Sequence, residues 1–267
     1  MSAPIFDSHG GLPPGDARDL DRRIDAYAAA AAEAGFCGGC VLALPGRDAE
    51  ADFIAAVGAR PGLVPIPAWP REARDAAAPE TVLDRFLARG VAGFHIHPRA
   101  SGLSPADPRF ARILRGAAER DLVVFHCTYA FASVVAPPPW PGAARLPVDP
   151  LPHLAAALAD LPDLRCVLLH GGGVELLRYA EFVRANPHLL LDLSLTLMKY
   201  PGSSLDLDLA FMFSAFDRRI CLGTDWPDYS PAATAARFEG FTAALSPEKR
   251  RNAASDNLRR LLRLDGE

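Results

Sequence analysis

The sequence lacks several features that would point to particular classes of protein. No segment approaches the roughly 18 consecutive apolar residues of a membrane-spanning helix, so we expect no membrane association. Basic residues are not in excess, because 28 Lys and Arg stand against 32 Asp and Glu and give a net charge of -4. A protein that binds phosphate backbones is normally basic, so this balance argues against nucleic acid as a partner. No secretory signal segment is recognisable, and we therefore expect a cytoplasmic protein.

Cysteine is also sparse, and the count is odd. The five cysteines are Cys37, Cys40, Cys127, Cys166 and Cys221, and most fall in short apolar runs. Only the first two form a C-x-x-C pair, and a structural zinc site would need a second pair at suitable spacing. We therefore expect reduced, packed thiols and no disulfide framework.

The sequence does contain a repeat of short apolar runs rich in Val, Ile, Leu and Phe. Eight such runs cover residues 4–9, 38–44, 63–68, 92–97, 121–126, 165–170, 189–194 and 219–225. Their length and composition are typical of strands buried on both faces. They recur about every 30 residues, which is the length that a strand, a helix and two loops require.

Helix signals lie between the runs. Residues 17–34 form an alanine-rich amphipathic segment with Asp16 placed as its N-cap and Gly35 as its end. An aspartate or serine followed by proline opens four later segments, at residues 107–108, 149–150, 230–231 and 246–247. The alternation predicts one domain over residues 1–267, a closed (β/α)8 TIM barrel, with a long proline-rich loop at 127–149. An open doubly wound sheet is the alternative, but its Gly-x-Gly-x-x-Gly fingerprint is missing.

Five polar residues stand at the carboxyl ends of the predicted strands. They are His9, His97, His126, His170 and Asp225. In a barrel these positions converge on the face that carries catalytic groups. Imidazoles with a carboxylate suit one divalent ion, for which zinc is our first expectation and manganese or iron are alternatives. A bound water would then be activated as a nucleophile, with Asp225 as metal ligand, proton acceptor or both.

Several segments carry a resemblance to a known family. They are Asp7-Ser8-His9, Val124-Phe125-His126, Leu169-His170-Gly171-Gly172-Gly173, Leu191-Asp192-Leu193-Ser194 and Gly223-Thr224-Asp225-Trp226-Pro227. In order and spacing they resemble the metal-dependent amidohydrolase superfamily, in the branch related to aminocarboxymuconate semialdehyde decarboxylase. The resemblance covers nearly the whole chain. It implies a metal held by His9, His126, His170 and Asp225, and it is consistent with a homodimer.

Gly11 departs from the family pattern, which places a second histidine two residues after His9. Its loss removes a ligand, so the four remaining groups hold the metal alone, or His97 helps, or no metal binds and the polar groups activate water directly. A lysine-bridged pair of metals is not expected, because the end of the fourth strand carries no lysine.

Substrate contacts are predicted around the same strand ends. Arg99 offers a planar cation that suits a carboxylate, and His97 and Trp226 are further expected contacts of the substrate. We expect a hydrolase for a small organic acid in which Asp225 is the general base and His170 polarises the carbonyl oxygen. Non-oxidative decarboxylation by the same residues is the alternative that the resemblance implies. Gly11 also suggests a third hypothesis, which is not enzymatic: a degenerate barrel that binds a ligand without turnover.

Overall fold

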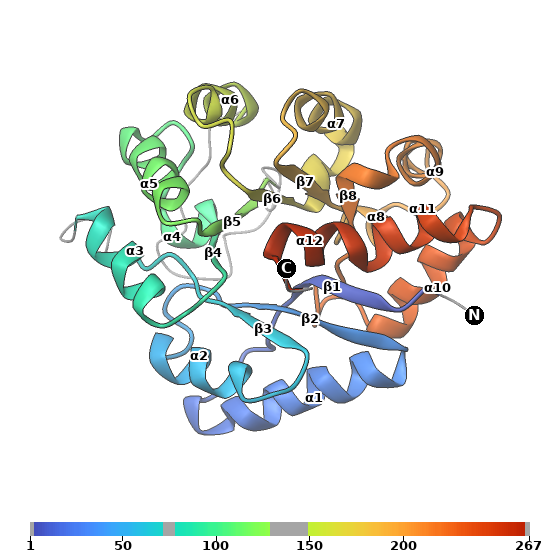
Figure 1. Ribbon diagram of the computed structural model, residues 1–267. Coiled ribbons are helices and arrows are strands. Elements are labelled where there is room, and N and C mark those ends of the chain that lie inside the picture. The colour runs from blue at the N-terminus through green and yellow to red at the C-terminus, as the bar shows by residue number, and fades with distance from the viewer. Residues whose placement is uncertain (1–2, 72–77, 129–148, 265–267) are drawn as a thin grey trace.

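Parallel strands alternate with helices along the computed structural model, which describes residues 3–71, 78–128 and 149–264 (Figure 1). The strands in this part of the chain are β1 Ile5–Gly10, β2 Phe36–Leu42, β3 Leu63–Ile66, β4 Gly93–Ile96, β5 Val123–Cys127, β6 Cys166–Leu169, β7 Leu189–Asp192 and β8 Ile220–Cys221. The helices are α1 Leu20–Glu33, α2 Glu50–Gly58, α3 Pro79–Ala88, α4 Pro98–Ser101, α5 Pro108–Glu119, α6 Leu151–Leu158, α7 Leu176–Ala185, α8 Thr196–Lys199, α9 Leu205–Ala215, α10 Pro231–Thr242, α11 Pro247–Arg251 and α12 Asn257–Leu262. The eight predicted strands are all present.

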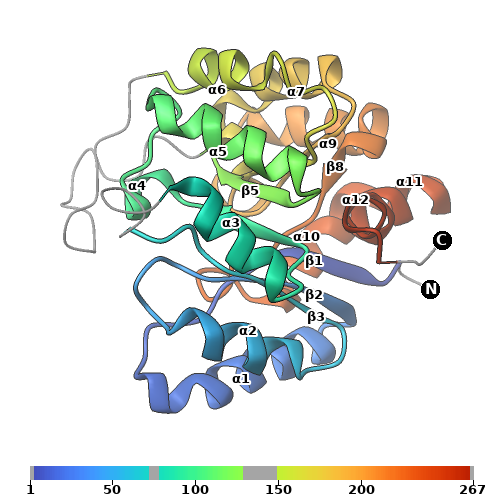
Figure 2. The same cartoon turned by 60° about the vertical axis from the view of Figure 1, so that its left-hand side comes forward.

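The strands close into a barrel across two short seams. Hydrogen-bonded ladders join β1, β2 and β3, and separately β4 through β8, all in parallel pairs. One seam is a bridge between Ala68 and His95, and the other is a bridge between Gly10 and Trp226. The helices surround the strands in both views of the ribbon (Figures 1 and 2). The predicted (β/α)8 TIM barrel is confirmed, and the carboxyl ends of its strands share one face.

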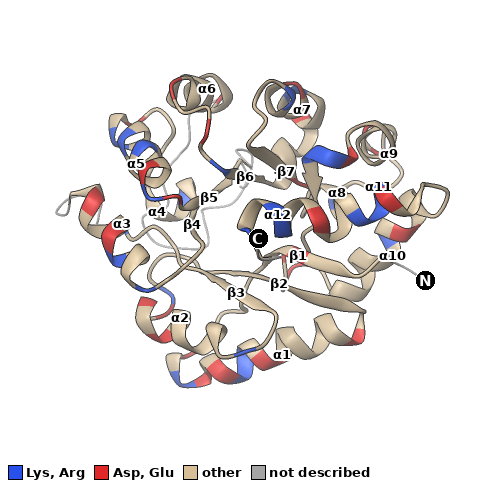
Figure 3. Cartoon of the chain, viewed as in Figure 1, with Lys and Arg blue, Asp and Glu red and all other residues tan. Residues whose placement is uncertain are grey.

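The core has two parts. A larger apolar cluster packs helices against the outer faces of the strands and includes Trp69, Phe86 and Phe94. A smaller cluster takes the alternate strand positions, such as Phe6 and Phe125, together with residues of α12. Charged residues gather on the outer helices and leave the strands largely without charge (Figure 3). This division follows from the side-chain alternation of strands, with apolar residues on both faces of a covered sheet.

The predicted caps explain where several helices begin. The Asp107, Ser230 and Ser246 side chains each accept a hydrogen bond from a backbone N–H of the first helical turn. Asp16 does the same, but it caps a short 3-10 turn, η1 Ala17–Asp19, that leads into α1, so the expected single helix over 17–34 has two parts. Gly35 ends this segment with a φ of 80°, as predicted.

The predicted fourth, sixth and eighth strands end too late at the functional face. His97 leaves β4 to cap α4, while His170 and Asp225 have φ angles of 64° and 58°. A residue in this left-handed region cannot continue a strand, so the chain turns at these positions. These three residues therefore stand on turns just beyond the sheet, whereas His9 and His126 lie within β1 and β5. Most of the proline-rich loop at 127–149 lies outside the described residues.

Candidate functional site

A cavity of about 470 Å³ opens at the carboxyl ends of the strands. Most of the residues singled out from the sequence line it, namely His9, His97, Arg99, His170, Asp225 and Trp226. They come from β1 and from the turns after β4, β6 and β8, which are separated by long stretches of chain. The barrel therefore brings these groups to one place, as the strand-end pattern predicts. Their individual roles stay predictions.

His9 and Asp225 face each other across the seam between the first and last strands. His9 Nε2 lies 3.6 Å from an Asp225 carboxylate oxygen, and both side chains are largely buried. The backbone N–H of Asp225 donates to the carbonyl of His9 at 2.8 Å, which holds the two turns together. Burial raises the pKa of Asp225, and nearby His9 partly offsets this rise. This separation is close to the edge between two ligands of one ion bound at about 2.1 Å.

His170 is buried beside His9, with ring centroids 4.9 Å apart. Its backbone N–H donates to an Asp192 carboxylate oxygen at 3.0 Å. Burial lowers the pKa of His170 to about 3, so its imidazole is neutral near pH 7. A neutral imidazole is the form that binds a metal.

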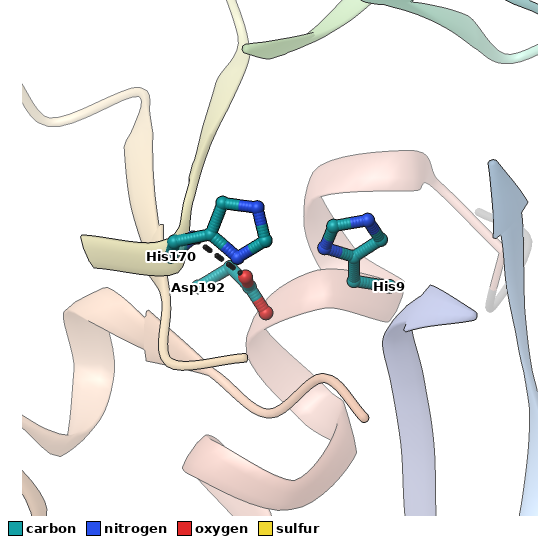
Figure 4. Close-up of side chains that lie close together, drawn as sticks. All are labelled: His9, His170 and Asp192. Carbon is teal, nitrogen blue, oxygen red and sulfur yellow. Dashed lines mark hydrogen bonds between the residues drawn. The ribbon is translucent and has the colours of Figure 1, made fainter. Parts of the chain in front are cut away.

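His9, His170 and Asp192 form a candidate metal site. One ligand atom from each lies within 4.8 Å of the others, and all three residues are buried. Figure 4 shows the imidazole rings on either side of a gap, with the Asp192 carboxylate at its edge. Two imidazoles and a carboxylate suit zinc, manganese or iron, so the residues fit the expected divalent ion.

Asp192 received no role from the sequence, although it occupies the end of the seventh strand. It accepts hydrogen bonds from Ser8 Oγ at 2.5 Å, from the His170 N–H and from the Ser194 hydroxyl. The seventh run was predicted to continue to Ser194, so Asp192 did not stand at a predicted strand end; the available signal was its place in the Leu191-Asp192-Leu193-Ser194 segment that resembles the family.

The predicted substrate contacts His97, Arg99 and Trp226 line the cavity from two sides, after β4 and after β8. His97 is buried, and its Nδ1 accepts a hydrogen bond from the Ala100 N–H at 3.2 Å. Burial also lowers the pKa of His97 well below its usual value. Arg99 and Trp226 line the cavity with it. The cavity thus offers a cation and an aromatic surface to a substrate.

Two further cations border the cavity. Lys199, at the end of α8, and Arg47, after β2, are both lining residues. Arg47 Nη1 donates to the carbonyl of Leu12 at 3.2 Å. Sequence reasoning missed Arg47 because no pattern marked the loop after the second strand as special.

His126 is separated from this group. It is absent from the cavity lining among the described residues, and its ring packs against Phe110 of α5 with centroids 5.2 Å apart. It shares a strand face with Val124, which belongs to the cluster between strands and helices. Its ligand role stays a prediction that this geometry does not support.

Gly11 lies against the neighbouring turn. Its N–H donates to the carbonyl of Trp226 at 2.9 Å, and a Cβ added at Gly11 would lie 2.5 Å from that oxygen. No side chain fits here without movement of the backbone. The glycine that replaces the expected histidine is thus also part of the seam that closes the barrel.

Comparison with known families identifies the class of protein that this barrel and site represent. The profile of the family described as Amidohydrolase matches residues 6–264, and the chain belongs to this family. The recognised resemblance is therefore confirmed. No curated protein matches the chain.

Solved structures with the same fold include three that cover nearly the whole chain. An uncharacterized TIM-barrel protein from Bordetella bronchiseptica is 18% identical, with a TM-score of 0.76 and coverage of 99% of this chain and 100% of that one. A 2,6-dihydroxybenzoate decarboxylase from Rhizobium is 16% identical, with a TM-score of 0.67 and full coverage of both chains.

The third is a dihydroxybenzoic acid decarboxylase from Polaromonas sp. JS666 with bound manganese and the inhibitor 2-nitroresorcinol. It is 14% identical, with a TM-score of 0.65 and coverage of 100% of this chain and 98% of that one. At these identities the three structures establish the fold.

Among the residues that the structure describes, no helix is long and apolar enough to cross a membrane.

Proposed function

We propose that the protein is a metal-dependent, non-oxidative decarboxylase that acts on a small aromatic or cyclic carboxylate. The observation that carries the proposal is the apposition of Asp225 and His9 at 3.6 Å in a cavity that Arg99 also lines. The activities named for the Rhizobium and Polaromonas proteins support decarboxylation over hydrolysis.

Asp225 is suited to carry the proton that decarboxylation consumes. Its side chain borders the cavity and lies 3.6 Å from His9 Nε2, so a carboxylate oxygen is available to take up and pass on a proton. We propose that an Asp225 oxygen passes this proton to the ring carbon that bears the carboxylate. The bond from that carbon to the carboxylate then breaks, its electron pair restores the ring, and carbon dioxide leaves. The products are the protonated ring and carbon dioxide, so atoms and charge balance.

The other residues position the substrate. Arg99 would pair with its carboxylate through the planar guanidinium, and Trp226 would support the flat ring. His9, His170 and Asp225 would hold a divalent ion, which when bound supplies Lewis acidity at the substrate oxygens. The walls of the cavity exclude part of the solvent and so strengthen each of these interactions.

The test measures both possible products from one panel of substrates. The protein, loaded with Mn²⁺ or Zn²⁺ or stripped by a chelator, is incubated with hydroxylated benzoates and, separately, with lactones and amides of small acids. We expect metal-dependent release of carbon dioxide with one equivalent of the decarboxylated ring. The variant Asp225→Asn should lose this activity. Asp228→Asn is its matched control, since Asp228 also borders the cavity but is exposed.

Two results would overturn the proposal. Acid release from a lactone or amide without carbon dioxide would establish the hydrolase that the sequence first suggested, with Asp225 as base and His170 at the carbonyl oxygen. A ligand that raises the melting temperature without any turnover across the panel would favour the binding barrel. Cytoplasmic location and a homodimer stay predictions.

A further inference from the structure

Ser194 lies at the centre of the polar cluster, on the turn after β7, and its side chain is buried. Its hydroxyl oxygen is 3.0 Å from His9 Nδ1 and 3.0 Å from His170 Nδ1. The same hydroxyl also donates a hydrogen bond to Asp192 Oδ1. One side chain thus contacts all three residues of the candidate metal site.

The hydrogens available to this cluster determine how its bonds are directed. A serine hydroxyl has one hydrogen and two lone pairs, and an ionised carboxylate only accepts. Because the Ser194 hydrogen goes to Asp192, its oxygen accepts from both imidazoles. His9 and His170 must therefore each carry a hydrogen on Nδ1, which leaves the Nε2 lone pairs unprotonated.

This arrangement excludes one of the two ways in which the cluster could hold an ion. An ion cannot bind an Nδ1 atom that carries a hydrogen, and both Nδ1 atoms donate theirs to the Ser194 hydroxyl. The Nε2 atoms keep their lone pairs, and that of His9 lies 3.6 Å from the Asp225 carboxylate.

We infer that Ser194 is a positioning residue that holds His9 and His170 as Nδ1–H tautomers, so that a metal binds through Nε2 with Asp225 while Asp192 stays in the hydrogen-bonded layer beneath. Partners that fix the tautomer and orientation of a metal-binding histidine also raise its affinity for the ion. The metal-binding part of this inference rests on the proposed function, whereas the tautomers do not depend on it.

The first experiment needs neither metal nor substrate. Long-range proton–nitrogen NMR spectra of metal-free protein labelled with ¹⁵N at histidine distinguish Nδ1–H from Nε2–H rings, with each signal assigned by single His→Gln variants. We expect Nδ1–H for His9 and His170. His97 is the internal reference of the opposite type, because its Nδ1 accepts from the Ala100 N–H. Nε2–H tautomers at both His9 and His170 in the unmodified protein would overturn the inference.

The second experiment measures Mn²⁺ and Zn²⁺ dissociation constants by competition with a chromogenic chelator. Ser194→Ala should weaken binding about 10- to 100-fold and shift both histidines toward Nε2–H. Ser8→Ala is the matched control, because Ser8 donates to the other oxygen of the same Asp192 carboxylate at 2.5 Å. We expect Ser8→Ala to change the metal affinity much less.

The opposite pattern would identify the other binding mode. Unchanged or tighter binding in Ser194→Ala, together with loss of binding in Asp192→Asn, would place the ion at the Nδ1 atoms and overturn the inference. If the unmodified protein binds neither ion, the proposed metal chemistry fails, while the NMR spectra still decide the tautomers.

Discussion

Asp7 lies in β1 and Asp225 on the turn after the neighbouring strand β8; both side chains are largely shielded from solvent, but their surroundings differ. Asp7 accepts four hydrogen bonds, from Tyr27 Oη, Thr224 Oγ1 and the backbone N–H groups of His9 and Thr224. Asp225 has His9 Nε2 at 3.6 Å and otherwise faces the cavity. Burial raises the pKa of both carboxyls, but only at Asp7 do several hydrogen bonds oppose the rise.

The contrast separates polar residues that support the fold, such as Asp7, from polar residues available for chemistry, such as Asp225; we call these two groups the structural layer and the chemical layer. Asp7 ties β1 to α1 and to the turn after β8, so its hydrogen bonds support the barrel. Asp225 keeps acceptor capacity for a proton, an ion or a substrate. Saturation with protein donors, more than burial or perturbed pKa, distinguishes the two roles.

The largest effect is expected at Asp225. Asp225→Asn removes the proton carrier and a metal ligand, so kcat for carbon dioxide release should fall on the order of 100-fold or more. The melting temperature should change little, because no buried hydrogen-bond network is broken. Kinetics and thermal unfolding of this variant beside Asp228→Asn check the prediction, and full activity in Asp225→Asn would remove Asp225 from the chemical layer.

Asp7→Ala should affect stability instead. It leaves four donors without their acceptor in the interior, and we expect a loss of roughly 3–5 kcal/mol in the free energy of unfolding. Tyr27→Phe removes only one of the four donors and should cost about 1 kcal/mol. Urea unfolding measures both changes. A loss at Asp7→Ala no larger than that at Tyr27→Phe would contradict the assignment of Asp7 to the structural layer.

Gly11 lies where the two layers meet. Gly11→Ala places a methyl group against the Trp226 carbonyl and should destabilise the protein by roughly 1–3 kcal/mol. Gly240→Ala is the control, because Gly240 lies in α10 with open space around it and alanine favours a helix by about 1 kcal/mol. The melting temperatures of the two variants should therefore move in opposite directions. An unchanged melting temperature in Gly11→Ala would show that the backbone at the contact between Gly11 and Trp226 adjusts at little cost.

Buried His126 should make the stability of the protein depend on pH. Burial lowers its pKa to about 3, below the usual 6.5, so the unfolded chain binds the extra proton between these values. Stability must then fall as pH drops below about 6.5, by up to about 1.4 kcal/mol per pH unit for this group. His126→Phe should remove this group's share of the slope, while buried His97 and His170 keep theirs, as measured by urea unfolding of metal-free protein from pH 7.5 to 5.

Metal content of the same variant decides the role of His126. Because its ring packs against Phe110 and away from the cavity, we expect His126→Phe to retain the metal bound by the unmodified protein. Loss of the metal, detected by elemental mass spectrometry, would restore the ligand role that the sequence predicts and move His126 into the chemical layer.

The strand-end histidines show how far sequence reasoning reaches. His9, His97 and His170 all border the cavity, because parallel strands in a barrel must end on one face. His126 has the same place in the sequence pattern, yet its side chain faces the helices. The last residue of a strand can point to either face, and a single residue of register decides which.

The sequence pattern could not assign roles to Asp192 and Ser194. Both stand in the apolar run of the seventh strand, and nothing in their sequence neighbourhood distinguishes a ligand from a hydrogen-bond partner. Their roles depend on the distances from Ser194 to two histidines that are 185 and 24 residues away.

The sequence by itself determined the alternation of strands and helices, the closed barrel and the family, because periodicity, caps and motif spacing are local or regularly repeated signals. Only the tertiary structure decided which polar groups are saturated and which face the cavity. Those distinctions depend on contacts between segments far apart in the chain, such as Asp7 with Thr224 and Gly11 with Trp226. Such contacts exist only once the barrel has closed and its side chains have packed.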